Sequence, residues 1–107
     1  MSIEHLGIEQ VWNGLLRYEQ NRRGNSLAVE GLATRVMLGL VKYVAADGEM
    51  TRINLSQIGR DVHLSREAMR SGLQRLSEAG IVRVETVRTG RPTNYCGYTE
   101  EFLEEVA

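Results

Sequence analysis

The sequence has few cysteines and no long apolar run, and each shortage excludes a class of protein. Cys96 is the only cysteine, so no disulfide can form within the chain, which favours a reducing compartment such as the cytoplasm. The longest apolar run covers residues 36–41, far short of the roughly 20 residues that a membrane span needs. The first residues also lack the basic and apolar stretches of a secretory signal. We therefore expect a chain that does not enter a membrane.

The common signatures of catalysis are missing as well. His5 and His63 lie far apart and have no second cysteine with which to complete a zinc site. Every glycine is isolated, so there is no glycine-rich phosphate loop, and no nucleophile elbow of the G-x-S-x-G type occurs. With 42% hydrophobic and 25% charged residues over 107 positions, the composition is that of one soluble globular domain. We expect a binding module rather than an enzyme, with no cofactor, no metal and no small-molecule ligand.

The formal net charge is only −1, but the charged residues are unevenly distributed. Residues 52–91 contain eight arginines and four acids, whereas residues 99–107 contain four glutamates and no base. The planar group of arginine pairs well with phosphates and guanine edges. A solvated surface has the same pattern, so the position of the arginines on the fold decides between the two interpretations.

Periodicity predicts helices and strands in a definite order. Residues 8–20 form an amphipathic helix, and residues 31–46, apolar nearly all round, form a central buried helix. A short strand is expected at residues 49–54. Residues 81–87 and 95–98 enclose a turn rich in glycine, proline and arginine, and they predict a hairpin.

Two further helices, joined by a tight turn, are predicted between the first strand and the hairpin. The shorter helix covers residues 55–62 and has Ser56 as its expected N-cap. The longer helix covers residues 66–79, with Ser65 as N-cap and Gly80 as its stop.

The run NLSQIGRDVHLSREAMRSGLQRLSEAGIVRVETVRTGRPTNY, residues 54–95, resembles the winged helix-turn-helix domains of bacterial, phage and plasmid regulators and replication proteins. The resemblance extends over residues 27–98. It implies a mainly α fold with a small antiparallel β-sheet (α+β), to which the helix predicted from periodicity adds an extra N-terminal helix. We therefore expect an amphipathic helical arm at residues 1–25, a winged helix-turn-helix domain at residues 26–98 and an acidic segment at residues 99–107; the first and last of these lie outside the resemblance.

The residues of this run suit a helix-turn-helix. Gly59 is the small residue expected where the two helices cross. The apolar anchors of the helices and the turn are Ile58, Val62, Leu64, Met69 and Leu73. Such turns usually have glycine where φ is positive, and His63 stands at that position here, at a cost of about 1 kcal/mol.

The resemblance implies that the helix at residues 66–79 enters the major groove of DNA. Its outward side chains are the candidates for base contacts: Arg66, Glu67, Arg70, Ser71 and Gln74. Arginine suits guanine, glutamine suits adenine and glutamate suits cytosine. Glu67 can also hold Arg70 or Ser71 in position, and for Glu67 and Gln74 a solvated role stays open.

Phosphate contacts are expected from helix N-termini and from the wing, residues 86–94. Ser56, Gln57 and Ser65 lie where backbone N–H groups favour phosphate, although capping alone also explains the two serines. The candidates in the wing are Arg88, Thr89, Arg91 and Thr93, placed for the minor groove or the DNA backbone. Arginines that only keep a hairpin tip soluble are the alternative.

The first helix is the candidate dimer interface, through Val11, Trp12, Leu15 and Leu16, with packing onto its own subunit as the alternative. A dimer places two recognition helices on half-sites roughly 34 Å apart. The resemblance thus implies a homodimeric, sequence-specific, duplex-DNA-binding transcriptional regulator, a repressor at an inverted-repeat operator. The alternatives are a plasmid or phage replication or partition accessory protein and a winged-helix protein-interaction module.

Overall fold

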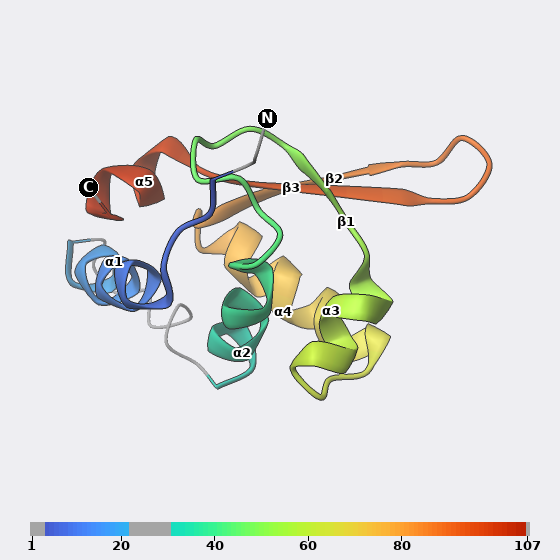
Figure 1. The fold of residues 1–107 in the computed structure, drawn as a ribbon, viewed down its shortest axis with the longest axis horizontal. Coiled ribbons are helices and arrows are strands. Elements are labelled where there is room, and N and C mark those ends of the chain that lie inside the picture. Colours follow the sequence, from blue (N-terminus) through green and yellow to red (C-terminus); the bar gives the residue numbers. More distant parts are fainter. Residues whose placement is uncertain (1–3, 22–30, 107) are drawn as a thin grey trace.

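Up to residue 98, the helices and strands follow the predicted order. The computed structural model describes residues 4–21 and 31–106, and this part of the chain forms five helices and one three-stranded sheet (Figure 1). In chain order they are α1 (Ile8–Asn21), α2 (Gly31–Leu40), β1 (Thr51–Ile53), α3 (Leu55–Asp61), α4 (Arg66–Glu78), β2 (Val82–Val87), β3 (Thr93–Tyr98) and α5 (Glu100–Val106). The predicted α+β class is confirmed. None of the helices in the described residues has the length and hydropathy that a bilayer crossing requires.

The sheet has the strand order β1-β3-β2, and both pairs are antiparallel. Thr51 stands opposite Cys96, and Val82 stands opposite Tyr98. Because Cys96 and Tyr98 are two residues apart, both point to the same face, and both are buried in the core. β3 begins at Thr93, two residues earlier than predicted. The outer end of the β2–β3 hairpin extends beyond the helices as a ribbon (Figure 1).

A tight turn joins α3 to α4. His63 has a φ of 57°, so the predicted left-handed position is confirmed. The Leu64 N–H donates to the Gly59 carbonyl at 2.8 Å, and a Cβ on Gly59 would lie 2.6 Å from the Leu64 carbonyl oxygen. Glycine therefore allows the turn to approach the helix this closely. Ser65 caps α4 as predicted, since its Oγ accepts a hydrogen bond from the Ala68 N–H at 3.1 Å.

The predicted N-cap of α3 is wrong. The cap is Asn54 and not Ser56, because Asn54 Oδ1 accepts a hydrogen bond from the Gln57 N–H at 3.1 Å. The helix begins directly after β1, which ends at Ile53, so the extended backbone of Asn54 is the joint between strand and helix.

The central helix is shorter than predicted, since α2 ends at Leu40 and not at residue 46. Hydrogen bonds of the helical type continue in the turn that follows, since the Val44 N–H still donates to the Leu40 carbonyl at 2.9 Å. From Ala45 onwards the N–H groups have partners outside the helix. The Ala45 N–H donates to Thr51 Oγ1 at 3.2 Å, and the Ala46 N–H donates to the Glu4 carbonyl at 2.9 Å. Backbone groups with such partners no longer take part in a helical ladder.

α1 lies beside α5, at the end of the molecule away from the hairpin tip (Figure 1). The contact is close at Gly14, where an added Cβ would lie 2.7 Å from Val106 and 3.3 Å from Phe102. Tyr18 Oη donates to the Ala79 carbonyl at 2.6 Å, which joins α1 to the end of α4. α1 and α5 thus share one core with the rest of the chain.

This packing corrects half of the predicted dimer interface. Val11 and Leu15 are fully buried in the core of their own chain, so neither can lie in an interface between subunits. Trp12 and Leu16 point away from that core and stay exposed. The predicted boundary between residues 25 and 26 lies outside the described residues.

Candidate nucleic-acid interface

One face of α4 is polar and exposed. Met69, Leu73 and Leu76 turn into the core, which leaves the opposite face to solvent. All five predicted side chains lie on it: Arg66, Glu67, Arg70, Ser71 and Gln74. A spacing of four residues places Arg66, Arg70 and Gln74 in one row along the helix. In the part of the chain that the structure describes, Glu67 forms no hydrogen bond with its neighbours on α4, so the holding role considered for it is not seen.

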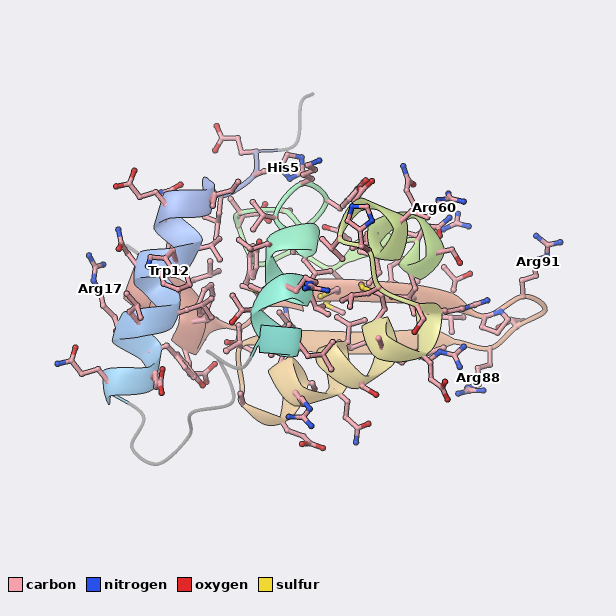
Figure 2. All side chains as sticks on the ribbon, turned by 90° about the horizontal axis from the view of Figure 1, so that it is seen from below. His5, Trp12, Arg17, Arg60, Arg88 and Arg91 are labelled. Atoms are coloured by element: carbon pink, nitrogen blue, oxygen red, sulfur yellow. The ribbon has the colours of Figure 1, made fainter. Side chains whose placement is uncertain are left out.

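The predicted contact residues of the wing lie at or near the hairpin tip. Arg88, Thr89 and Arg91 are exposed, and Gly90 turns the chain between them with a φ of 76°. Figure 2 shows Arg88 and Arg91 at the same end of the molecule, with Arg91 next to the tip. Thr93 is only partly exposed because it begins β3, and its hydroxyl donates to the Arg91 carbonyl at 3.4 Å.

A groove of about 440 Å³ lies between α4 and the hairpin and joins these two groups. Arg70 and Gln74 line it from α4, and Arg88 lines it from the hairpin. The other lining residues are Leu55, Leu73, Ser77, Glu78, Val84, Thr86, Pro92 and Asn94. Gln74 Nε2 donates to Glu78 Oε1 at 3.0 Å across one turn of the helix. Cationic, amide and apolar side chains from two elements therefore face the same space.

A smaller hollow of about 310 Å³ lies at the start of α3. Gln57 and Thr93 line it as candidates from the sequence, together with Arg52 and Asn54, which the sequence analysis did not single out. A signal for Asn54 was present, because an asparagine followed three residues later by glutamine is typical of a helix start. Ser56 is exposed on α3 but lines neither hollow.

Charge is separated along the molecule, whose longest dimension is 40 Å. Within residues 4–21 and 31–106, the guanidinium groups of Arg66, Arg70, Arg88 and Arg91 form no hydrogen bond or ion pair. The four glutamates of α5 lie at the end opposite the hairpin tip (Figure 1). The cationic end therefore keeps its charge available for an anionic partner.

Two titratable groups near the sheet are structural. Tyr43 Oη donates to the Asp61 carboxylate at 2.6 Å, and this hydrogen bond, followed by burial, raises the pKa of Tyr43. The phenol is protonated at neutral pH in any case, and the shift moves its ionisation further from that range. Cys96 is buried as predicted from its strand, and burial raises the pKa of its thiol to about 12. The reactive thiolate is thus scarce at neutral pH.

Comparison with known proteins bears on the fold. No protein-family profile and no curated protein sequence matches the chain. Among solved structures, a transcriptional regulator homologue from Pyrococcus horikoshii OT3 is similar with a TM-score of 0.54 and 18% identity, over 84% of this chain and 83% of that one. Disulfide-formed AbfR is similar with a TM-score of 0.55 and 20% identity, over 91% of this chain and 56% of that one. The fold is a winged helix-turn-helix.

The chain spans little more than half the length of the AbfR chain that it matches. In this winged helix, α3 and α4 form the helix-turn-helix and the β2–β3 hairpin forms the wing. The predicted wing, residues 86–94, is the outer part of that hairpin. The groove lies between the two elements for which the resemblance implies DNA contact, α4 and the wing.

Proposed function

We propose that this winged helix binds duplex DNA with sequence specificity and regulates transcription, and that it is not an enzyme. One observation carries the proposal: the exposed row of Arg66, Arg70 and Gln74 on α4 faces the same side as the groove that Arg88 of the wing completes. An α-helix fits the major groove of B-DNA, where base edges carry a distinct pattern of donors and acceptors. The free guanidinium groups supply the charge that phosphates require.

α4 provides the base contacts in this arrangement. Arg66 and Arg70 pair with guanine O6 and N7, and each bidentate contact discriminates by about 1–3 kcal/mol. Glu67 and Ser71 flank the row and face neighbouring base edges. Ser65 stands at the start of the helix, where its hydroxyl accepts from the Ala68 N–H and keeps its own hydrogen to donate to a phosphate.

The wing and the start of α3 provide contacts to the DNA backbone. Arg88 and Arg91 at the hairpin tip suit phosphates or a narrow minor groove, where the negative potential is enhanced. Thr89 is exposed beside them, and Gln57 and Thr93 share the smaller hollow. Ser56 is exposed one residue before Gln57 on α3. These contacts orient the protein on the duplex, whereas α4 reads the sequence.

We further propose a homodimer formed through α1. Ile8, Trp12 and Leu16 follow one another at intervals of four residues and are 63%, 46% and 44% exposed. Contiguous apolar side chains on a protein surface mark contact sites, and a second copy offers the same stripe. The dimer reads an inverted repeat with half-sites roughly 34 Å apart. Occupying such an operator over a promoter is sufficient for repression, and the site of action is the cytoplasm.

Selection of bound sequences from a random duplex pool tests the proposal and supplies a target. The affinity of the selected duplex is then measured by fluorescence anisotropy for the wild type, Arg70→Ala and Arg17→Ala. We expect Arg70→Ala to weaken specific binding by about 1–3 kcal/mol. Arg17→Ala is the matched control, because Arg17 lies at the other end of the molecule (Figure 2) and donates to a backbone carbonyl, that of Glu105, at 3.0 Å.

Two results would overturn the proposal: no salt-dependent binding by the wild type, or the same affinity for both variants. Footprinting then separates regulation from replication. A single protected operator that overlaps a promoter supports the regulator, whereas tandem iterated sites favour a replication or partition role.

A further inference from the structure

We infer that Gln74 determines specificity at one base pair and that Glu78 is the residue that orients it. The base that Gln74 contacts then carries an exocyclic amino group. The inference rests on the proposed DNA binding and concerns how the same site selects sequence. Its basis is the hydrogen bond from Gln74 Nε2 to Glu78 Oε1 at 3.0 Å, between two exposed side chains that line the groove beside the wing.

The chemistry of this pair sets the direction of the glutamine amide. An ionised carboxylate only accepts hydrogen bonds, and a glutamine amide has one donating and one accepting end. Gln74 must therefore turn its nitrogen towards Glu78, and its carbonyl oxygen faces away from that carboxylate. Glu78 takes one of the two amide hydrogens, so Gln74 offers a ligand its carbonyl oxygen, with the second N–H beside it.

An acceptor in the major groove selects among the four bases. Adenine N6 and cytosine N4 are donors at that edge, whereas guanine O6 and N7 and thymine O4 only accept. The oriented Gln74 therefore favours adenine or cytosine. Without Glu78 the amide can turn over, so that its nitrogen takes the place of the carbonyl oxygen and donates to guanine or thymine.

The position of Glu78 agrees with an orienting role. Its carboxylate stands one helical turn after Gln74 and two turns after Arg70, on a surface that otherwise offers cations and amides to the groove. A negative charge there repels phosphates. Glu78 is thus poorly suited to a contact with the DNA backbone and well suited to hold the glutamine.

The test uses four duplexes that differ at one base pair of the selected site. The base pair is found with Gln74→Ala, as the position where that variant loses its preference. We expect the wild type to favour adenine or cytosine there by about fivefold or more. Glu78→Ala should reduce this ratio to about twofold or less, whereas Glu78→Gln should retain only part of it, because the new amide can accept from Gln74 Nε2 but can also donate to Gln74 Oε1.

Glu104→Ala is the control for charge, since it removes one exposed carboxylate from α5 at the opposite end of the molecule and should leave the ratio unchanged. A wild-type preference for guanine or thymine, or an unchanged ratio in Glu78→Ala, would overturn the inference while leaving DNA binding intact. Loss of preference in Glu78→Ala with partial recovery in Glu78→Gln supports it. A wild type that binds no duplex refutes the proposed function itself.

Discussion

The close approach of the α3–α4 turn to Gly59 can be tested by adding a single methyl group at that residue. In Gly59→Ala, the new Cβ would lie 2.6 Å from the Leu64 carbonyl oxygen and 3.2 Å from Met69 Cγ. The nearer neighbour is backbone, in a turn that the Leu64 N–H holds to the Gly59 carbonyl, so it cannot rotate away as a side chain could. Overpacking costs about 1–3 kcal/mol, and alanine returns about 1 kcal/mol of helix propensity.

Because the neighbour is backbone, the upper end of the overpacking range applies. We expect Gly59→Ala to lower the free energy of unfolding by about 2 kcal/mol, equivalent to a fall in Tm of roughly 10 °C for a domain of this size. The assay is urea and thermal unfolding followed by circular dichroism. Gly31→Ala is the matched control, because a Cβ at the start of α2 meets nothing within 4 Å. It should be neutral or stabilise by up to about 1 kcal/mol.

The reasoning is refuted if Gly59→Ala is as stable as the wild type, or if both variants shift stability in the same direction. Either result would show that the turn does not approach α3 as closely as the distances require.

Three further predictions concern the proposed dimer, the wing and the buried thiol. Trp12→Glu should yield monomers in sedimentation velocity at concentrations where the wild type is a dimer, because a charge replaces an exposed apolar side chain; dimers in both would contradict this. Arg91→Ala should weaken binding evenly across sequences and lower the slope of log affinity against log salt by about 1, and an unchanged slope counts against a phosphate contact. Cys96, whose burial raises its pKa to about 12, should react with a thiol reagent at neutral pH only after unfolding; rapid reaction of the native protein would show that the strand is open.

Local signals predicted α4 well. Ser65 caps α4 through the N–H group of Ala68, three residues away, and Gly80 follows its end with a φ of 80°. His63 takes the left-handed conformation that the turn requires. Each of these effects depends on residues within a few positions of one another, so a single sequence contains the information.

Signals that depend on distant partners were misjudged. Hydrogen bonds of the helical type after α2 stop at Val44, and the next two N–H groups, those of Ala45 and Ala46, donate to Thr51 and Glu4, neither of which belongs to the helix. The error at the cap of α3 is of another kind, because Asn54 and Gln57 are three residues apart and form a local signal that the choice of Ser56 overlooked. Periodicity describes the preferences of a segment and not the partners that arrive from elsewhere in the chain.

The amphipathic first helix shows the same limit. Its apolar positions form one stripe in the sequence, but the stripe is too wide for all of its residues to face the core of the same chain. Val11 and Leu15 meet the core of their own chain, whereas Trp12 and Leu16, one position further along, face outwards. Which part of a wide apolar face is covered depends on where α5 packs.

Neighbouring residues are sufficient to produce several features, which therefore follow from the amino acids alone: the order of the helices and strands up to residue 98, the caps of α4 and the polar character of its outer face. Only the tertiary structure decided that Arg70, Gln74 and Arg88 line one groove and that Val11 and Leu15 are unavailable to a second subunit. Both outcomes arise from contacts between elements far apart in the chain, and their geometry is set by how the hairpin and α5 fold back onto the helices.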